Sequence, residues 1–136
     1  MLSHLCLHSD VVSNLELQVY RAQYGRDIVA AKKYKDGHFH RKSNIDLFCR
    51  EVSIHSRLEH PHILKFLGAV VDDPARFCIL TEFIPGGSLY EVLHLRRTSM
   101  DFRTRIVTAA GVASGMECVS MLGLIFCGGV VGGVVG

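Results

Sequence analysis

The spacing of apolar and polar residues predicts a sheet over the first part of the chain. Leu17 and Val19 alternate with polar neighbours, which is the period of a half-buried strand. Turn-forming residues at 24–27 and at 72–74 separate apolar segments that are typical of further strands. The pattern predicts about four strands, at residues 17–22, 28–34, 63–71 and 77–83. Residues 1–15 show no clear period and predict either a short strand or an irregular lead-in.

Helical features follow the strands. Ser43 with Asp46 three positions later resembles a capping box, and it predicts a helix that ends near Leu58. Two further helices are expected, one capped by Ser88 and running to about Leu95, the other capped by Asp101 and carrying Ile106, Val107, Ala110, Val112, Ala113 and Met116. Strands in one run and helices in another predict an α+β fold.

Glu51 lies on the expected apolar face of the first helix. That face consists of Leu47, Glu51, Ile54 and Leu58, at helical spacing. A carboxylate buried there without a partner would cost several kcal/mol, so a cation should lie opposite it. Lys32 is the cation that the sequence supplies. The alternative is that Glu51 lies at the edge of the face and stays hydrated.

Lys32 shares one face of its strand with Ala30, because side chains two positions apart point the same way. The small side chain of Ala30 leaves room for a flat ligand, and Lys32 reaches past it. The alternative is an ordinary edge strand with a hydrated lysine, which is the expectation for Lys33.

Composition limits the possible partners and compartments. A chain of 136 residues is long enough for one domain with a core. A net charge of +2 favours neither nucleic acid nor another strongly charged partner. The five Cys form no C-x-x-C pair, and the N-terminus lacks the basic start and the long apolar run of a signal peptide. We therefore expect reduced thiols and a cytoplasmic protein.

Four motifs occur in a fixed order. They are Val29-Ala30-Ala31-Lys32, then Glu51 within Phe48-Cys49-Arg50-Glu51-Val52, then His60-Pro61-His62-Ile63, and finally the segment from Ile79 to Leu89 that contains Pro85-Gly86-Gly87-Ser88. Together they resemble the small lobe and hinge of a protein kinase of the tyrosine-kinase-like group.

The resemblance implies a kinase-like small lobe, with a twisted antiparallel sheet and one helix, followed by two helices of an incomplete helical lobe. Residues 16–122 would be a partial kinase domain, with the small lobe ending near 84 and the start of the large lobe at 85–122. Residues 1–15 stay unassigned, and residues 123–136 form a Gly/Val-rich tail.

The resemblance also implies a site for ATP. Lys32 and Glu51 would form the ion pair that positions the phosphates. Thr81 stands at the gatekeeper position, and the carbonyl of Glu82 and the N–H of Ile84 would meet the adenine. The implied nucleotide-binding residues are Val19, Ala30, Lys32, Thr81, Glu82 and Ile84.

The chain departs from the kinase pattern in three ways. Residues 13–18, which precede Val19, contain no glycine where a glycine-rich phosphate loop is expected. His55 stands where kinases place an aliphatic residue. No H-R-D-x-x-x-x-N and no D-F-G motif occurs, so the general base and the magnesium ligands are absent from this sequence.

We therefore expect a truncated kinase domain that binds ATP weakly if at all and is inactive alone. Complete relatives would phosphorylate Ser/Thr or Tyr of proteins. The alternatives are a non-catalytic kinase-like module that binds a protein partner, or a membrane protein anchored by its tail.

Two histidine pairs and the tail complete the sequence. The pairs His38/His40 and His60/His62 have no acidic or Cys partner at ligand spacing, so no metal site is expected. Residues 118–136 carry no charge, and as a helix they would span about 28 Å, which is enough to cross a bilayer core. Their Gly and Val content favours a translated non-coding extension over a membrane anchor.

Overall fold

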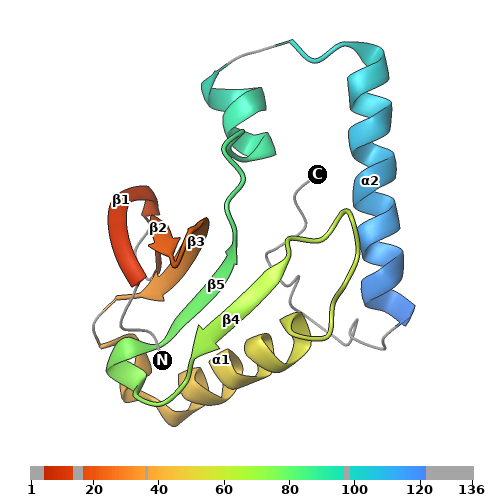
Figure 1. Ribbon diagram of the computed structural model, residues 1–136. Coiled ribbons are helices and arrows are strands. Elements are labelled where there is room, and N and C mark those ends of the chain that lie inside the picture. Colours follow the sequence, from red (N-terminus) through yellow and green to blue (C-terminus); the bar gives the residue numbers. More distant parts are fainter. Residues whose placement is uncertain (1–4, 14–16, 36, 97–98, 122–136) are drawn as a thin grey trace. The chain divides into compact units, whose positions relative to one another are not determined.

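The computed structural model describes residues 5–13, 17–35, 37–96 and 99–121 of the chain (Figure 1). It contains two compact units. The first consists of Met1–Arg57 and Phe66–Phe83, and the second of Leu58–Lys65 and Ile84–Gly136. All the strands and helix α1 belong to the first unit, and helix α2 belongs to the second (Figure 1).

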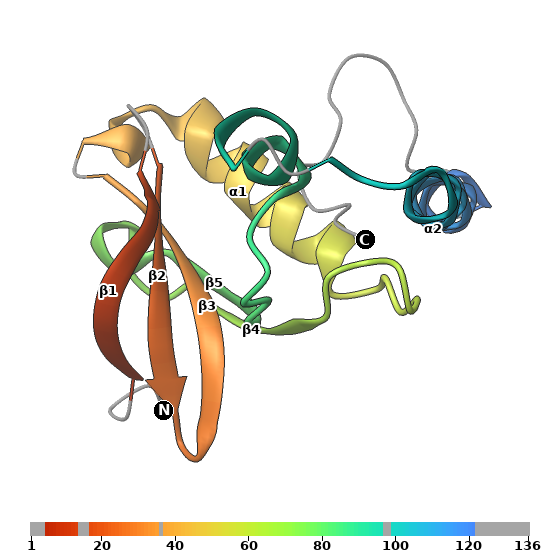
Figure 2. The ribbon, with the colours of Figure 1, turned by 90° about the horizontal axis from the view of Figure 1, so that it is seen from above.

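The first unit is built on a five-stranded antiparallel sheet with strand order β1-β2-β3-β5-β4. The strands are β1 (Leu5–Ser13), β2 (Leu17–Tyr24), β3 (Asp27–Tyr34), β4 (Phe66–Val70) and β5 (Cys78–Glu82). A tight turn joins β2 to β3 (Figure 2). Gly25 lies in this turn at φ 63°, a backbone conformation that a side chain would strain. The predicted α+β class is confirmed.

Two strands differ from the sequence prediction. Of the two alternatives for residues 1–15, the strand holds: β1 lies in this segment as a fifth strand, and at nine residues it is longer than the expected short strand. Its register against β2 shifts twice, between Leu7 and Ser9 and between Asp10 and Val12, and such irregularities break the two-residue alternation that marks a strand. The strand expected at 63–71 is shorter, because Ile63 is buried in a loop of the second unit instead.

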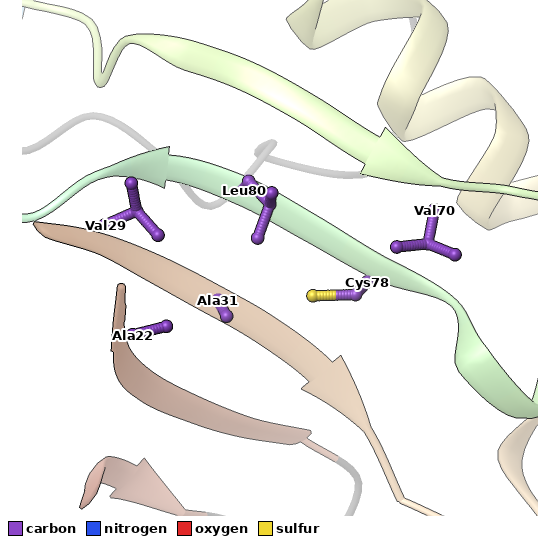
Figure 3. Close-up of a cluster of buried hydrophobic side chains, with 6 residues drawn as sticks. All are labelled: Ala22, Val29, Ala31, Val70, Cys78 and Leu80. Atoms are coloured by element: carbon purple, nitrogen blue, oxygen red, sulfur yellow. The ribbon is translucent and has the colours of Figure 1, made fainter. Parts of the chain in front are cut away.

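One face of the sheet forms a core of small and branched side chains. The register pairs Ala22 with Val29 and Ala31 with Leu80, so that inward-facing residues of neighbouring strands meet. The buried residues of this cluster are Ala22, Val29, Ala31, Val70, Cys78 and Leu80 (Figure 3). Alternate residues of β3 therefore belong to the core.

A second, aromatic core joins the sheet to α1 (Lys42–His55). The Phe48 ring stacks on Phe77 with centroids 4.4 Å apart, and Ile79 of β5 completes the buried cluster. Phe39, in the short 3₁₀ helix η1 (His38–His40), packs edge-on against Phe77 at 4.8 Å. The corresponding 3₁₀ turn before β5 is η2 (Pro74–Arg76).

The prediction for the apolar face of α1 is wrong in part. Leu47 is 64% exposed, whereas its neighbour Phe48 is 2% exposed. Both residues lie on plausible helical stripes, but the sheet supplies aromatic partners only for Phe48. The expected Ser43 cap is also wrong, because α1 begins at Lys42 with no side-chain cap.

The second unit contains η3 (Glu91–Leu95), a short helix of π type, and α2 (Phe102–Met121). The predicted caps are confirmed. Ser88 and Glu91 form a reciprocal capping box, in which the Ser88 N–H donates to Glu91 Oε2 at 2.9 Å and the Glu91 N–H donates to Ser88 Oγ at 3.2 Å. Asp101 Oδ1 accepts from the N–H of Thr104 at 3.0 Å.

Small residues form the buried face of α2. Gly111 and Gly115 are buried one turn apart, followed by Val119. A Cβ atom at Gly115 would lie 3.1 Å from the carbonyl oxygen of His62, and one at Gly111 would lie 3.1 Å from the His62 Nδ1. The absence of side chains thus lets the loop that carries His62 approach the helix backbone.

Replacing the buried aromatic residue of α1 tests its packing. Phe48→Ala should lower the free energy of unfolding by about 3–5 kcal/mol, because it opens a cavity against Phe77. Leu47→Ala removes an exposed side chain of the same helix and should change it by less than about 0.5 kcal/mol. Urea denaturation measures both, and equal losses would contradict the observed helix face.

The close approach at α2 gives a second test. Gly115→Val should destabilise the second unit by roughly 1–3 kcal/mol, because the added atoms meet the His62 carbonyl. Ala113→Val adds the same branched side chain at an exposed position of the helix and should cost only about 0.5 kcal/mol through helix propensity. Amide hydrogen exchange along α2 measures the difference, and a larger effect at Ala113 would rule out the steric explanation.

Candidate functional site

An ion pair joins β3 to α1. Lys32 Nζ lies 2.5 Å from Glu51 Oε1, and the two side chains are 25% and 21% exposed. The prediction that Glu51 faces the sheet and meets Lys32 is confirmed, as is the partial burial of both charges. Of the two alternatives for Glu51, the paired one holds, although the carboxylate lies beside the aromatic core rather than in the middle of the expected stripe.

Tyr34 is a third member of this cluster, and the sequence analysis missed it. Its hydroxyl donates to Glu51 Oε2 at 2.8 Å, and its ring centroid lies 5.5 Å from Lys32 Nζ. Burial raises the pKa of the Tyr34 hydroxyl, and the nearby Glu51 carboxylate raises it further, so the proton stays on the oxygen. A signal existed, since Tyr34 follows Lys32 by two positions and therefore shares its face of the strand.

The sheet register brings most of the other predicted residues together. Val19 of β2 pairs with Lys32, and Thr81 of β5 pairs with Ala30, so these four side chains share one face. Thr81 is buried, and its hydroxyl donates to the carbonyl oxygen of Glu82 at 3.2 Å. The side chain of Glu82 lies on the opposite face, because Glu82 pairs with Val29.

Ile84 and Arg21 complete the account of the site residues. Ile84 belongs to the second unit and is 43% exposed. Arg21 pairs with Ala30 in the register, and its guanidinium carbon lies 5.8 Å from the centroid of the Phe83 ring. The sequence analysis missed Arg21, which adds a second cation to the face of Lys32.

Several histidines pack against aromatic rings or form hydrogen bonds. His55 is 7% exposed, and its ring centroid lies 5.5 Å from that of Phe66, so it packs as a buried polar residue. His38 stacks on Tyr34 at 4.7 Å, and His60 Nε2 lies 3.1 Å from Ser114 Oγ. Among the described residues, no group of three or more His, Cys, Asp or Glu side chains is arranged to hold a metal ion.

The structure leaves the expectations for the tail untested. Residues 122–136, which include most of the uncharged segment, lie outside the described residues. Within the part of the chain that is described, no helix has the length and apolar character needed to cross a bilayer.

Comparison of the sequence with known proteins identifies the family of the chain. The family model for protein tyrosine and serine/threonine kinases matches residues 10–126. The mouse (Mus musculus) serine/threonine-protein kinase TNNI3K is 40% identical over 121 residues, which are 89% of this chain and 14% of that protein. The Arabidopsis thaliana serine/threonine-protein kinase CTR1 is 41% identical over 101 residues, 73% of this chain and 12% of that protein.

The chain therefore belongs to the protein tyrosine and serine/threonine kinase family. The resemblance stated from the sequence motifs is confirmed. The chain spans only 14% and 12% of the lengths of these two relatives.

Removing the shared acceptor tests the cluster. Glu51→Ala leaves the partly buried Tyr34 hydroxyl and the Lys32 ammonium without their common partner, so it should lower the free energy of unfolding by about 1–2 kcal/mol after allowance for partial exposure. Asp46→Ala removes an exposed carboxylate of the same helix and should cost less than about 0.5 kcal/mol. Urea denaturation compares them, and indistinguishable values would mean that the cluster contributes nothing to stability.

Proposed function

We propose that the chain provides the nucleotide-positioning small lobe of a protein kinase. The observation that carries this proposal is the Lys32–Glu51 ion pair between β3 and α1, with Val19, Ala30 and Thr81 on the same face of the sheet. Membership of the kinase family supports the assignment.

In this proposal each residue has a defined task. The Lys32 ammonium contacts the phosphates of ATP, and Glu51 holds the ammonium in place. The small side chain of Ala30 and the branched one of Val19 contact the adenine ring. The backbone carbonyl of Glu82 and the N–H of Ile84 bind its polar edge.

Phosphoryl transfer needs more than this lobe. Magnesium ions neutralise charge that develops on the transferring phosphoryl group, and a general base orients the hydroxyl nucleophile. The 136 residues contain neither H-R-D-x-x-x-x-N nor D-F-G, so this chain does not supply the residues that would hold the metal or act as the base. We therefore propose that it has no kinase activity by itself.

The relatives suggest the reaction of the complete domain. Several are described as serine/threonine-protein kinases. A domain that contains this lobe together with a catalytic loop would accordingly transfer the terminal phosphate of ATP to Ser or Thr hydroxyls of a protein substrate, in the cytoplasm.

Protection of Lys32 from acylation tests the nucleotide site. ATP should slow acylation of Lys32 by an N-hydroxysuccinimide ester, with half-protection at about 1 mM or higher because few contacts are present. Acylation of the adjacent Lys33 should be unaffected, which provides an internal control. Mass spectrometry of the labelled peptides gives both rates.

Two further measurements accompany that experiment. Lys32→Met should abolish ATP binding by calorimetry, whereas Lys33→Met should preserve it. No transfer of phosphate to a protein substrate should be detected with either the wild type or the variants. Equal protection of both lysines would refute the site, and magnesium-dependent transfer that Lys32→Met abolishes would refute the claim of inactivity.

A further inference from the structure

We propose that Tyr34 is a positioning residue that fixes the Glu51 carboxylate and thereby aims it at Lys32. This inference rests on the proposed function, since positioning Lys32 matters for a bound nucleotide. Its physical basis is the pair of hydrogen bonds that Glu51 accepts from one strand, Oε1 from Lys32 at 2.5 Å and Oε2 from Tyr34 at 2.8 Å.

The Lys32–Glu51 pair cannot hold its own geometry firmly. Both side chains are long and partly exposed, so ordering them costs entropy that offsets part of the attraction between the charges. A third group that restrains one partner reduces that cost. Tyr34 is placed to do so, because only two side-chain torsions separate its ring from the backbone.

The Tyr34 ring is itself held by aromatic neighbours. It stacks on His38 with an interplanar angle of 23° and centroids 4.7 Å apart, and it meets Phe39 and Phe48 edge-on at 5.1 and 5.9 Å. These contacts come from η1 and α1, so the hydroxyl points at Glu51 from a packed ring. The hydrogen bond to a charged acceptor is of the stronger kind.

The same arrangement gives Glu51 a partner that does not depend on Lys32. While the Lys32 ammonium contacts a phosphate as well as Oε1 of Glu51, Oε2 of Glu51 still accepts from Tyr34. The carboxylate therefore keeps its orientation and continues to hold the ammonium. A kinase lobe that had only the ion pair would lose this restraint.

The variant Tyr34→Phe separates positioning from packing, because it keeps the ring and removes only the hydroxyl. The ratio of acylation rates of Lys32 and Lys33, measured without nucleotide, should rise roughly 3- to 10-fold as the ion pair loosens. Tyr20→Phe is the matched control, since it removes a tyrosine hydroxyl that donates to Gln18 on the same sheet at 2.9 Å. It should leave the ratio unchanged.

A double variant tests whether Tyr34 acts through Glu51. In a Glu51→Ala background the lysine ratio should already be high, and adding Tyr34→Phe should not raise it further. A ratio that Tyr34→Phe leaves at the wild-type value, while Glu51→Ala raises it, would overturn the inference. A further rise in the double variant would overturn it as well, because Tyr34 would then act independently of the carboxylate.

Two additional readouts keep the test decisive. Glu51→Ala keeps the aromatic neighbours of Tyr34 and removes the acceptor of its hydroxyl. Nitration of Tyr34 by tetranitromethane should therefore be faster in this variant than in the wild type. An unchanged rate would count against the contact. ATP protection of Lys32 should weaken in Tyr34→Phe by a similar 3- to 10-fold factor. Absence of ATP protection in the wild type would reject the nucleotide site, whereas the nucleotide-free lysine ratio would still decide the role of Tyr34.

Discussion

The Glu51 carboxylate links helix α1 to the sheet of the first unit through side-chain hydrogen bonds. One of its oxygens accepts from Lys32 and the other from Tyr34, and both donors lie on β3. The aromatic core beside it, formed by Phe48, Phe77 and Ile79, sets the distance between α1 and the strand. Polar and apolar contacts therefore support the same helix position.

Strand β3 divides its residues between two tasks. Val29 and Ala31 point into the buried cluster with Leu80, and Ala30 and Lys32 point to the face that carries the candidate site. The alternation explains why two alanines stand side by side for different reasons. Ala31 is small because the core is crowded, whereas at Ala30 a small side chain leaves the candidate site open.

Much of the fold was accessible from the sequence because its signals are local. The strands β2, β3 and β5 follow from alternation and turn residues, and the caps at Ser88 and Asp101 follow from hydrogen bonds that span three residues. The Lys32–Glu51 pair was accessible for a different reason, because a charge on an apolar helix face requires a partner.

The remaining features depend on contacts between distant segments. Phe48 rather than Leu47 is buried on α1 because its ring stacks on Phe77, which lies almost thirty positions away in the sequence. Bulges hide the period of β1, and the short β4 leaves Ile63 to a loop. Tyr34 was missed because periodicity shows which face a side chain occupies but not which acceptor it reaches.

The strict alternation of β3 also limits how this segment can change in evolution. Inserting a single residue before Val29, with the pairing positions of β5 kept, would exchange the two faces of the strand. Lys32 would then lie on the face of the cluster that contains Cys78 and Leu80, and Ala31 would take its place opposite Ile79. Such a change would bury an unpaired charge as well as remove the ion pair. An insertion in β3 is therefore opposed by the stability of the fold itself.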